Sequence, residues 1–212
     1  GIPYTIYVYS GFSESQEPVY PVLLSYMYFA GTRREEALAY LSACSRETLP
    51  APADPRIRFE RLAEHVLRTR SLPEQRTVAR NLAEILGVSW TDLEASRRFH
   101  LMRASEIEET AAEGGDIQLH THRHQWPSDR GSALKEIREN RAYLEPLAGR
   151  RLNHFCYPGG RWSEEQFPFL REAGIESAVT CEAGGNGPGS NPLALTRFLD
   201  GQHISKVEFE AE

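Results

Sequence analysis

The sequence contains little cysteine. Cys44, Cys156 and Cys181 are the only three in 212 residues, and no two of them form a Cys-x-x-Cys pair. An odd number at wide spacing argues against a disulfide framework and against a thiolate zinc site. We therefore expect buried free thiols.

Long apolar runs and an excess of basic charge are also missing. No run approaches the roughly 20 apolar residues of a membrane helix, and Gly1–Ser10 lacks the basic flank and apolar stretch of a signal peptide. Net charge is -6, with basic residues scattered among acidic ones, which argues against a nucleic-acid partner. We expect no membrane span. The chain does not begin with Met, so localisation is weakly constrained, with the cytoplasm slightly favoured; oligomeric state cannot be predicted.

The first half of the chain is mostly helical in pattern. Residues 4–9 alternate and are rich in β-branched and aromatic side chains, which predicts a strand. Apolar residues then recur at three-and-four spacing. This spacing predicts helices over 35–43, 59–70 and 74–86. We interpret 1–212 as a single domain in which about 14–98 is a helical insertion and 99–212 carries the motifs.

From Met102 onward the pattern alternates between helix and strand. The capping boxes Ser105-x-x-Glu108 and Ser163-x-x-Gln166, and an apolar face over 132–147, predict helices. Strands are predicted over 116–120, 152–157, 176–180 and 193–198. This order without hairpin turns implies an α/β fold with a parallel sheet, whose functional residues lie at the carboxyl ends of the strands.

The most informative segment is His120-Thr-His-Arg-His124, at the end of a predicted strand. Neutral imidazole is a common zinc ligand, and a chain that turns at the end of a strand can direct two rings at one ion. We therefore expect a divalent metal, with zinc favoured, bound by His120 and His124. The alternative is a polar loop with solvated histidines.

These motifs resemble those of the NodB-type polysaccharide deacetylases, carbohydrate esterase family 4. His120-Thr121-x-x-His124 is similar to the family's His-Ser/Thr-x-x-His metal motif. The segment 102–119 resembles the helix, glycine and strand before that motif, Phe155–Gly160 its third motif, and Gly174–Thr180 the strand that follows. Gly1–Val8 looks like the family's second strand. The resemblance runs nearly end to end, apart from about 14–98.

The resemblance implies a distorted (β/α) barrel and removal of N-acetyl groups from an amino-sugar glycan, with release of acetate. In the family's pattern His120 and His124 would hold the ion, and Thr121 would brace the loop by hydrogen bonding. The backbone N–H of Gly159 would face the developing oxyanion. Tyr157 and Trp162 would either form a cleft wall that stacks a sugar or pack in the core.

The sequence departs from the family at several positions. The family's first strand ends in Asp-Asp-Gly, which supplies the catalytic base and the third metal ligand, and no Asp-Asp pair exists here. Either Tyr9-Ser10-Gly11 is a degenerate form of that motif, or the chain begins after it. We favour the second interpretation, in which the first strand is missing and the base lies upstream of Gly1. Cys156 stands where an Arg can brace the base. His203 is a weak candidate for the general acid, because its spacing differs from the family's.

Two other functions are considered. A non-catalytic carbohydrate-binding relative would keep the cleft without the Asp-Asp base. A PHP-type phosphoesterase would use His120 and His122, which share one face of a strand as residues i and i+2. That motif belongs on a first strand, however, and here it lies past the middle of the chain.

Overall fold

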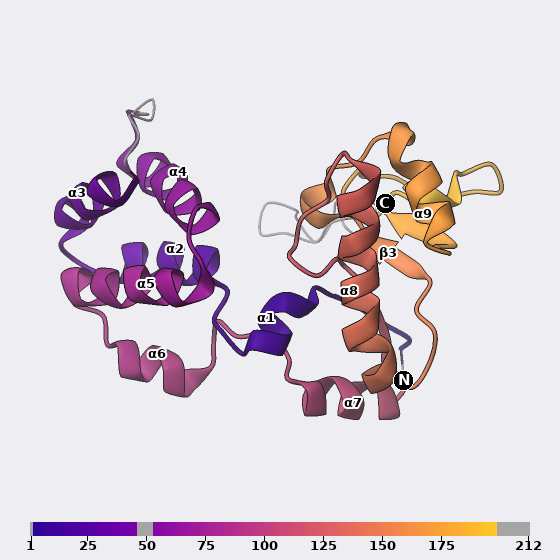
Figure 1. Cartoon of the computed structure of the whole chain (residues 1–212), viewed down its shortest axis with the longest axis horizontal. Coiled ribbons are helices and arrows are strands. Elements are labelled where there is room, and N and C mark those ends of the chain that lie inside the picture. The colour runs from indigo at the N-terminus through magenta and orange to yellow at the C-terminus, as the bar shows by residue number, and fades with distance from the viewer. Residues whose placement is uncertain (1, 46–52, 199–212) are drawn as a thin grey trace, which may run out of the picture. The chain divides into compact units, whose positions relative to one another are not determined.

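The structure is a computed structural model that describes residues 2–45 and 53–198. It contains two compact units, each described below by itself (Figure 1). Gly1–Glu14 and Met102–Glu212 belong to one, here called the sheet unit, and Ser15–Leu101 forms the other, the helical unit. Whether the helical unit is an insertion within a single domain stays a prediction.

The sheet unit is built on four parallel strands in the order β1-β2-β3-β4. Their bounds are β1 Thr5–Val8, β2 Asp116–Leu119, β3 His154–Cys156 and β4 Ser177–Val179. Each lies within a strand predicted from the sequence, and the parallel α/β sheet is confirmed. Successive strands are neighbours in space, as they are in a (β/α) barrel. The carboxyl ends of β1 and β2 lie side by side, because Val8 pairs with Leu119.

The last predicted strand, over 193–198, is much shorter than expected. Only Leu195 pairs with the sheet, through a single parallel bridge to Val179. Pro192–Ala194 forms a 3-10 turn, η3, in its place. Proline favours such a turn because its ring fixes φ and removes a backbone donor.

Helices connect the strands of the sheet unit. They are α1 Ser10–Ser15, α7 Ala104–Ala112, α8 Arg130–Ala148 and α9 Phe167–Glu172, with 3-10 turns η1 Pro158–Gly160 and η2 Glu164–Gln166. Helices α7 and α8 pack against each other and against β2, and α9 packs against α8 (Figure 1). Helix α8 begins after Asp129, whose carboxylate accepts the Ser132 N–H, and ends at Gly149 in the left-handed conformation.

One capping box was predicted in the wrong register. The backbone N–H of Arg103 donates to the Glu106 carboxylate at 2.8 Å, so α7 begins at Ala104 and Ser105 lies inside it. A Glu three residues after the cap is the decisive group, and the sequence offers Glu106 as well as Glu108. The second box is confirmed, since Ser163 N–H donates to Gln166 Oε1 at 3.2 Å.

The helical unit confirms the three predicted helices and adds two. Its helices are α2 Tyr20–Ala30, α3 Arg34–Ser45, α4 Pro55–Arg68, α5 Leu72–Leu86 and α6 Trp90–Ser96. Helix α2 reads Tyr-Pro-Val-Leu-Leu-Ser-Tyr-Met-Tyr-Phe-Ala. It is apolar on nearly all sides, so it shows no periodic pattern that distinguishes a helix from a strand.

The sheet unit has its own hydrophobic core. Side chains from all four strands and from α7, α8 and α9 meet there, among them Val8, Ile107, Leu119, Leu144, Phe155, Leu170 and Ala178. All three cysteines are free thiols, as predicted, but only Cys156 is buried; Cys44 and Cys181 are partly exposed. Among residues 2–45 and 53–198, no helix is long and apolar enough to cross a membrane.

Candidate metal and substrate site

His120 is the first residue after β2 and is held at two points. Its backbone N–H donates to the Asn140 side chain at 3.0 Å, and its ring Nδ1 lies 2.7 Å from the Cys156 carbonyl oxygen. A carbonyl oxygen can only accept a hydrogen bond, so Nδ1 carries the hydrogen. The Nε2 lone pair is then left for a metal ion, in the arrangement common among metal-binding histidines.

Burial keeps the His120 ring neutral. Loss of solvation lowers its pKa to about 4, and the hydrogen bond to the Cys156 carbonyl only partly opposes that shift. A metal ligand must be unprotonated. His120 is therefore ready to bind a metal ion at neutral pH without first releasing a proton.

His124 lies beside His120. The two ring centroids are 4.9 Å apart, and the Tyr9 ring is also 4.9 Å from that of His124. The chain reaches this position through two residues with positive φ, Thr121 at 66° and His124 itself at 56°. Burial lowers the pKa of His124 as well. The two histidines predicted to bind one ion are thus close together at the end of β2.

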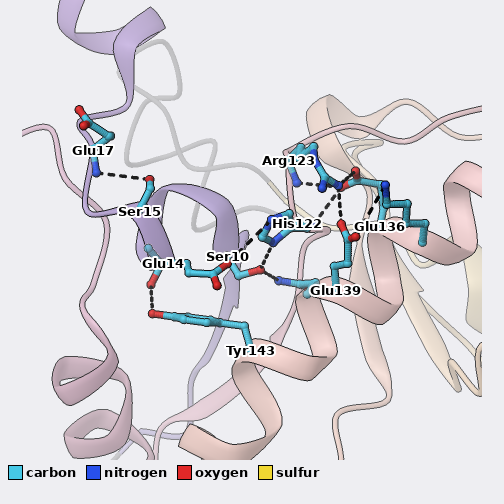
Figure 2. Close-up of polar contacts among 12 residues, drawn as sticks. Ser10, Glu14, Ser15, Glu17, His122, Arg123, Glu136, Glu139 and Tyr143 are labelled. Carbon is cyan, nitrogen blue, oxygen red and sulfur yellow. Dashed lines mark hydrogen bonds and ion pairs between the residues drawn. The ribbon is translucent and has the colours of Figure 1, made fainter. Parts of the chain in front are cut away.

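The His122 ring contacts helix α1 and not the other two histidines. Its Nδ1 lies 2.9 Å from Ser10 Oγ at the start of α1, and its Nε2 is 4.0 Å from a Glu14 carboxylate oxygen. Figure 2 shows the His122 ring turned toward Ser10. This arrangement favours His124 over His122 as the partner of His120, against the pattern expected of a PHP-type site.

The loop after β2 is held by helix α8. The buried Glu136 carboxylate accepts the backbone N–H groups of His122 at 3.0 Å and Arg123 at 2.7 Å. It also pairs with the Arg123 guanidinium, which contacts Glu139 as well (Figure 2). A carboxylate that accepts several backbone N–H groups holds a loop firmly, because charged hydrogen bonds are the stronger kind.

Thr121 braces the loop differently from the expectation. Its side chain is fully buried, but among the described residues its Oγ1 has no hydrogen-bond partner. The Thr121 carbonyl instead accepts the Ser10 N–H at 3.3 Å, and the next carbonyl, of His122, accepts the Gly11 N–H at 2.7 Å. The loop is therefore tied to α1 through its backbone.

The third-motif segment forms a tight turn next to the site. Gly159 has φ of 62°, and a Cβ placed on it would meet no atom within 4 Å. Tyr157 is fully buried and donates its hydroxyl to the Leu193 carbonyl at 2.7 Å. Of the two roles considered for Tyr157, the structure shows the core role.

Trp162 is half-buried and lies flat against Phe167, with ring centroids 5.6 Å apart and an angle of 11° between the planes. Its Nε1 donates to Glu182 at 3.1 Å. Phe167 thus covers one face of the indole, and the Tyr157 ring lies nearby with its centroid 6.2 Å from that of Trp162. Whether Trp162 contacts a sugar and whether Gly159 faces an oxyanion stay predictions.

Comparison with known proteins finds a family similarity over part of the chain. Residues 79–178 match the family model for polysaccharide deacetylases. This part of the chain is similar to the polysaccharide deacetylases. The match contains the His120–His124 segment and the Phe155–Gly160 segment, two of the motifs that carried the resemblance to NodB-type deacetylases. No curated protein sequence shows a significant match.

One solved deacetylase structure supports the fold, and two others match with lower TM-scores. The deacetylase PplD from Streptococcus pyogenes, solved in complex with acetate, is 17% identical with a TM-score of 0.50, over 99% of this chain and 96% of that one. IcaB from Ammonifex degensii is 21% identical with a TM-score of 0.45, over 86% and 83% of the two chains. A polysaccharide deacetylase from Bacillus cereus is 18% identical with a TM-score of 0.46, over 53% of this chain. That match spans 36% of the Bacillus cereus chain.

The described residues bring together His120 and His124, the two side chains expected to bind the metal ion. Within residues 2–45 and 53–198, no group of three or more His, Cys, Asp or Glu side chains is arranged to hold an ion. Two neutral imidazoles with one fixed tautomer fit a zinc site that takes its third ligand from elsewhere. His203, the candidate acid, lies outside the described residues.

Sequence reasoning missed the polar residues of α8 that support the site. Glu136 and Asn140 are buried on a helix face that also carries Ala133, Ile137 and Leu144. Polar residues one turn apart within an apolar face were the available signal, since buried polar groups require partners. That face was interpreted only from its apolar members.

Proposed function

We propose that this chain is a metal-dependent deacetylase that removes N-acetyl groups from an amino-sugar glycan and releases acetate. One observation supports this most strongly. The His120 and His124 rings lie 4.9 Å apart at the carboxyl end of β2, inside the segment that matches the polysaccharide deacetylases. Their chemistry favours zinc, although other divalent ions accept similar ligands.

Each residue of the site would have a defined task. A bound divalent ion would polarise the acetamide carbonyl and lower the pKa of water. His120 presents its Nε2 because Nδ1–H is fixed on the Cys156 carbonyl. His124, at the other end of the same five-residue segment, would be the second ligand of the ion. The Gly159 N–H would donate to the oxyanion that forms at the carbonyl carbon, an interaction worth roughly 3 kcal/mol in comparable enzymes.

The test is acetate release from N-acetylglucosamine oligomers by the zinc-loaded full-length protein, because the catalytic base is expected upstream of Gly1. We expect release by the parent, and at least a hundredfold less in both His120→Ala and His124→Ala, because each loses a ligand of the metal ion. His122→Ala is the matched control and should retain activity within about tenfold, because its ring contacts Ser10 instead. Zinc binding with no release from any acetylated glycan would contradict the proposal and support the carbohydrate-binding alternative.

A further inference from the structure

Asn140 lies at the centre of α8 with its side chain completely buried. Its Oδ1 accepts the His120 backbone N–H at 3.0 Å. Its Nδ2 donates to the Val8 carbonyl at 2.9 Å and to Ser10 Oγ at 3.0 Å. Only one orientation of the amide satisfies these partners, because the Val8 carbonyl can only accept and the His120 N–H can only donate.

These contacts join two strand ends. The pairing of β1 with β2 ends at Val8 and Leu119, and Asn140 binds the Val8 carbonyl and the N–H of the residue after Leu119. One amide therefore sets the position of the β1 end relative to the point where His120 leaves β2. Beyond that point the backbone turns through Thr121 with positive φ, so the direction taken by His120 also directs the chain toward His124.

The Ser10 contact extends the same support to the other side of the loop. Ser10 Oγ accepts from Asn140, and its hydroxyl hydrogen can then be given to His122 Nδ1 at 2.9 Å. His122 is thereby kept apart from the metal-binding pair. Glu136, one turn earlier on α8, holds the N–H groups of His122 and Arg123. Helix α8 thus fixes the loop at His120, His122 and Arg123.

We infer that Asn140 is a positioning residue for the metal site: it fixes the backbone of His120 and so sets the affinity of the His120–His124 pair for a divalent ion. The inference rests on the proposed function, in which these two histidines are metal ligands. Supporting residues of this kind typically change metal affinity 10- to 100-fold when removed.

The experiment compares Asn140→Ala with Leu144→Ala. Leu144 is fully buried one turn further along the same helix and packs in the apolar core, so its truncation controls for lost stability. Zinc chloride is titrated into each metal-free protein by calorimetry, at a temperature where thermal unfolding shows the variant folded. Asn140→Ser replaces Asn140→Ala if the latter does not fold, because it leaves a small polar side chain.

We expect Asn140→Ala to bind zinc at least tenfold more weakly than the parent, and Leu144→Ala to stay within threefold of the parent. A long-range proton–nitrogen NMR spectrum of the metal-free protein reports the tautomer of the His120 ring. A loss of stability alone does not change this signal. The Nδ1-protonated signal of His120 should weaken in Asn140→Ala and persist in Leu144→Ala.

Two failures are distinguishable. The positioning role is wrong if the parent binds zinc and the affinity of Asn140→Ala is within threefold of that of the parent. It is also wrong if Asn140→Ala and Leu144→Ala weaken zinc binding equally. In both cases the proposed function stands. If the parent binds no zinc, the proposed function is contradicted and the inference with it.

Discussion

The tautomer of His120 is the residue-scale feature on which the site depends. The Cys156 carbonyl fixes the hydrogen on Nδ1, and burial keeps the ring uncharged. Neither effect can be predicted from the sequence: His120 and Cys156 are 36 positions apart, and burial of the ring depends on tertiary packing. The sequence does indicate that His120 and His124 act together, since a five-residue segment can turn both rings to one point.

A pH dependence follows for the metal-free protein. The His120 pKa of about 4 lies below its ordinary value of 6.5, so the unfolded chain binds the proton more tightly. The contribution of His120 to the free energy of unfolding is therefore complete above pH 6.5 and is lost as the pH falls toward 4. Between pH 7.5 and 4.5 we expect this contribution to the free energy of unfolding to fall by roughly 2 to 3 kcal/mol.

Urea unfolding of the parent and of His120→Gln at both pH values isolates this contribution. Other titrating groups, His124 included, are present in both proteins. The parent should lose roughly 2 to 3 kcal/mol more of its free energy of unfolding than the variant between the two pH values. Equal losses would show that the His120 ring is not held neutral by burial.

At the scale of elements, the turn η1 offers two glycines with the same backbone conformation and different surroundings. Gly159 and Gly160 have φ of 62° and 67°, so alanine costs each about 1 kcal/mol in backbone strain. A Cβ at Gly159 would meet nothing within 4 Å, whereas one at Gly160 would lie 2.6 Å from Cys181 Cβ.

We expect Gly159→Ala to lower the free energy of unfolding by about 1 kcal/mol, and Gly160→Ala by about 3 kcal/mol because overpacking against Cys181 adds to the strain. Urea denaturation with a shared m value measures both. Similar losses would mean that the turn moves freely away from Cys181 and is not a rigid part of the site.

Elements were predicted well where one face is apolar and the other polar. Helices α4, α5 and α8 show that pattern, and so does the short strand β1. Helix α2 was missed because it is apolar on nearly all sides, and the strand over 193–198 was overextended because Pro192 begins a turn. Both errors arise where tertiary packing or a single ring constraint outweighs local periodicity.

At the scale of the whole molecule, the motifs that resemble those of the deacetylases are all in the sheet unit, as far as they fall within the described residues. The helical unit carries no recognised chemistry, although its residues 79–101 fall within the family match. The parallel sheet and the position of the histidines at the end of a strand could be predicted from the sequence, because both follow from the order of local patterns. The hydrogen bonds from α8 that hold the loop after β2 could not be predicted. They depend on which side chains of the helix point toward the ends of two strands.

The central claim is that His120 and His124, and not His122, form the metal site of this chain. The most direct measurement is a calorimetric zinc titration of the metal-free parent, His124→Ala and His122→Ala. We predict that His124→Ala loses at least tenfold in affinity, on the scale of removing a ligand, while His122→Ala stays within threefold of the parent. Strong loss in His122→Ala with unchanged binding in His124→Ala would contradict the account.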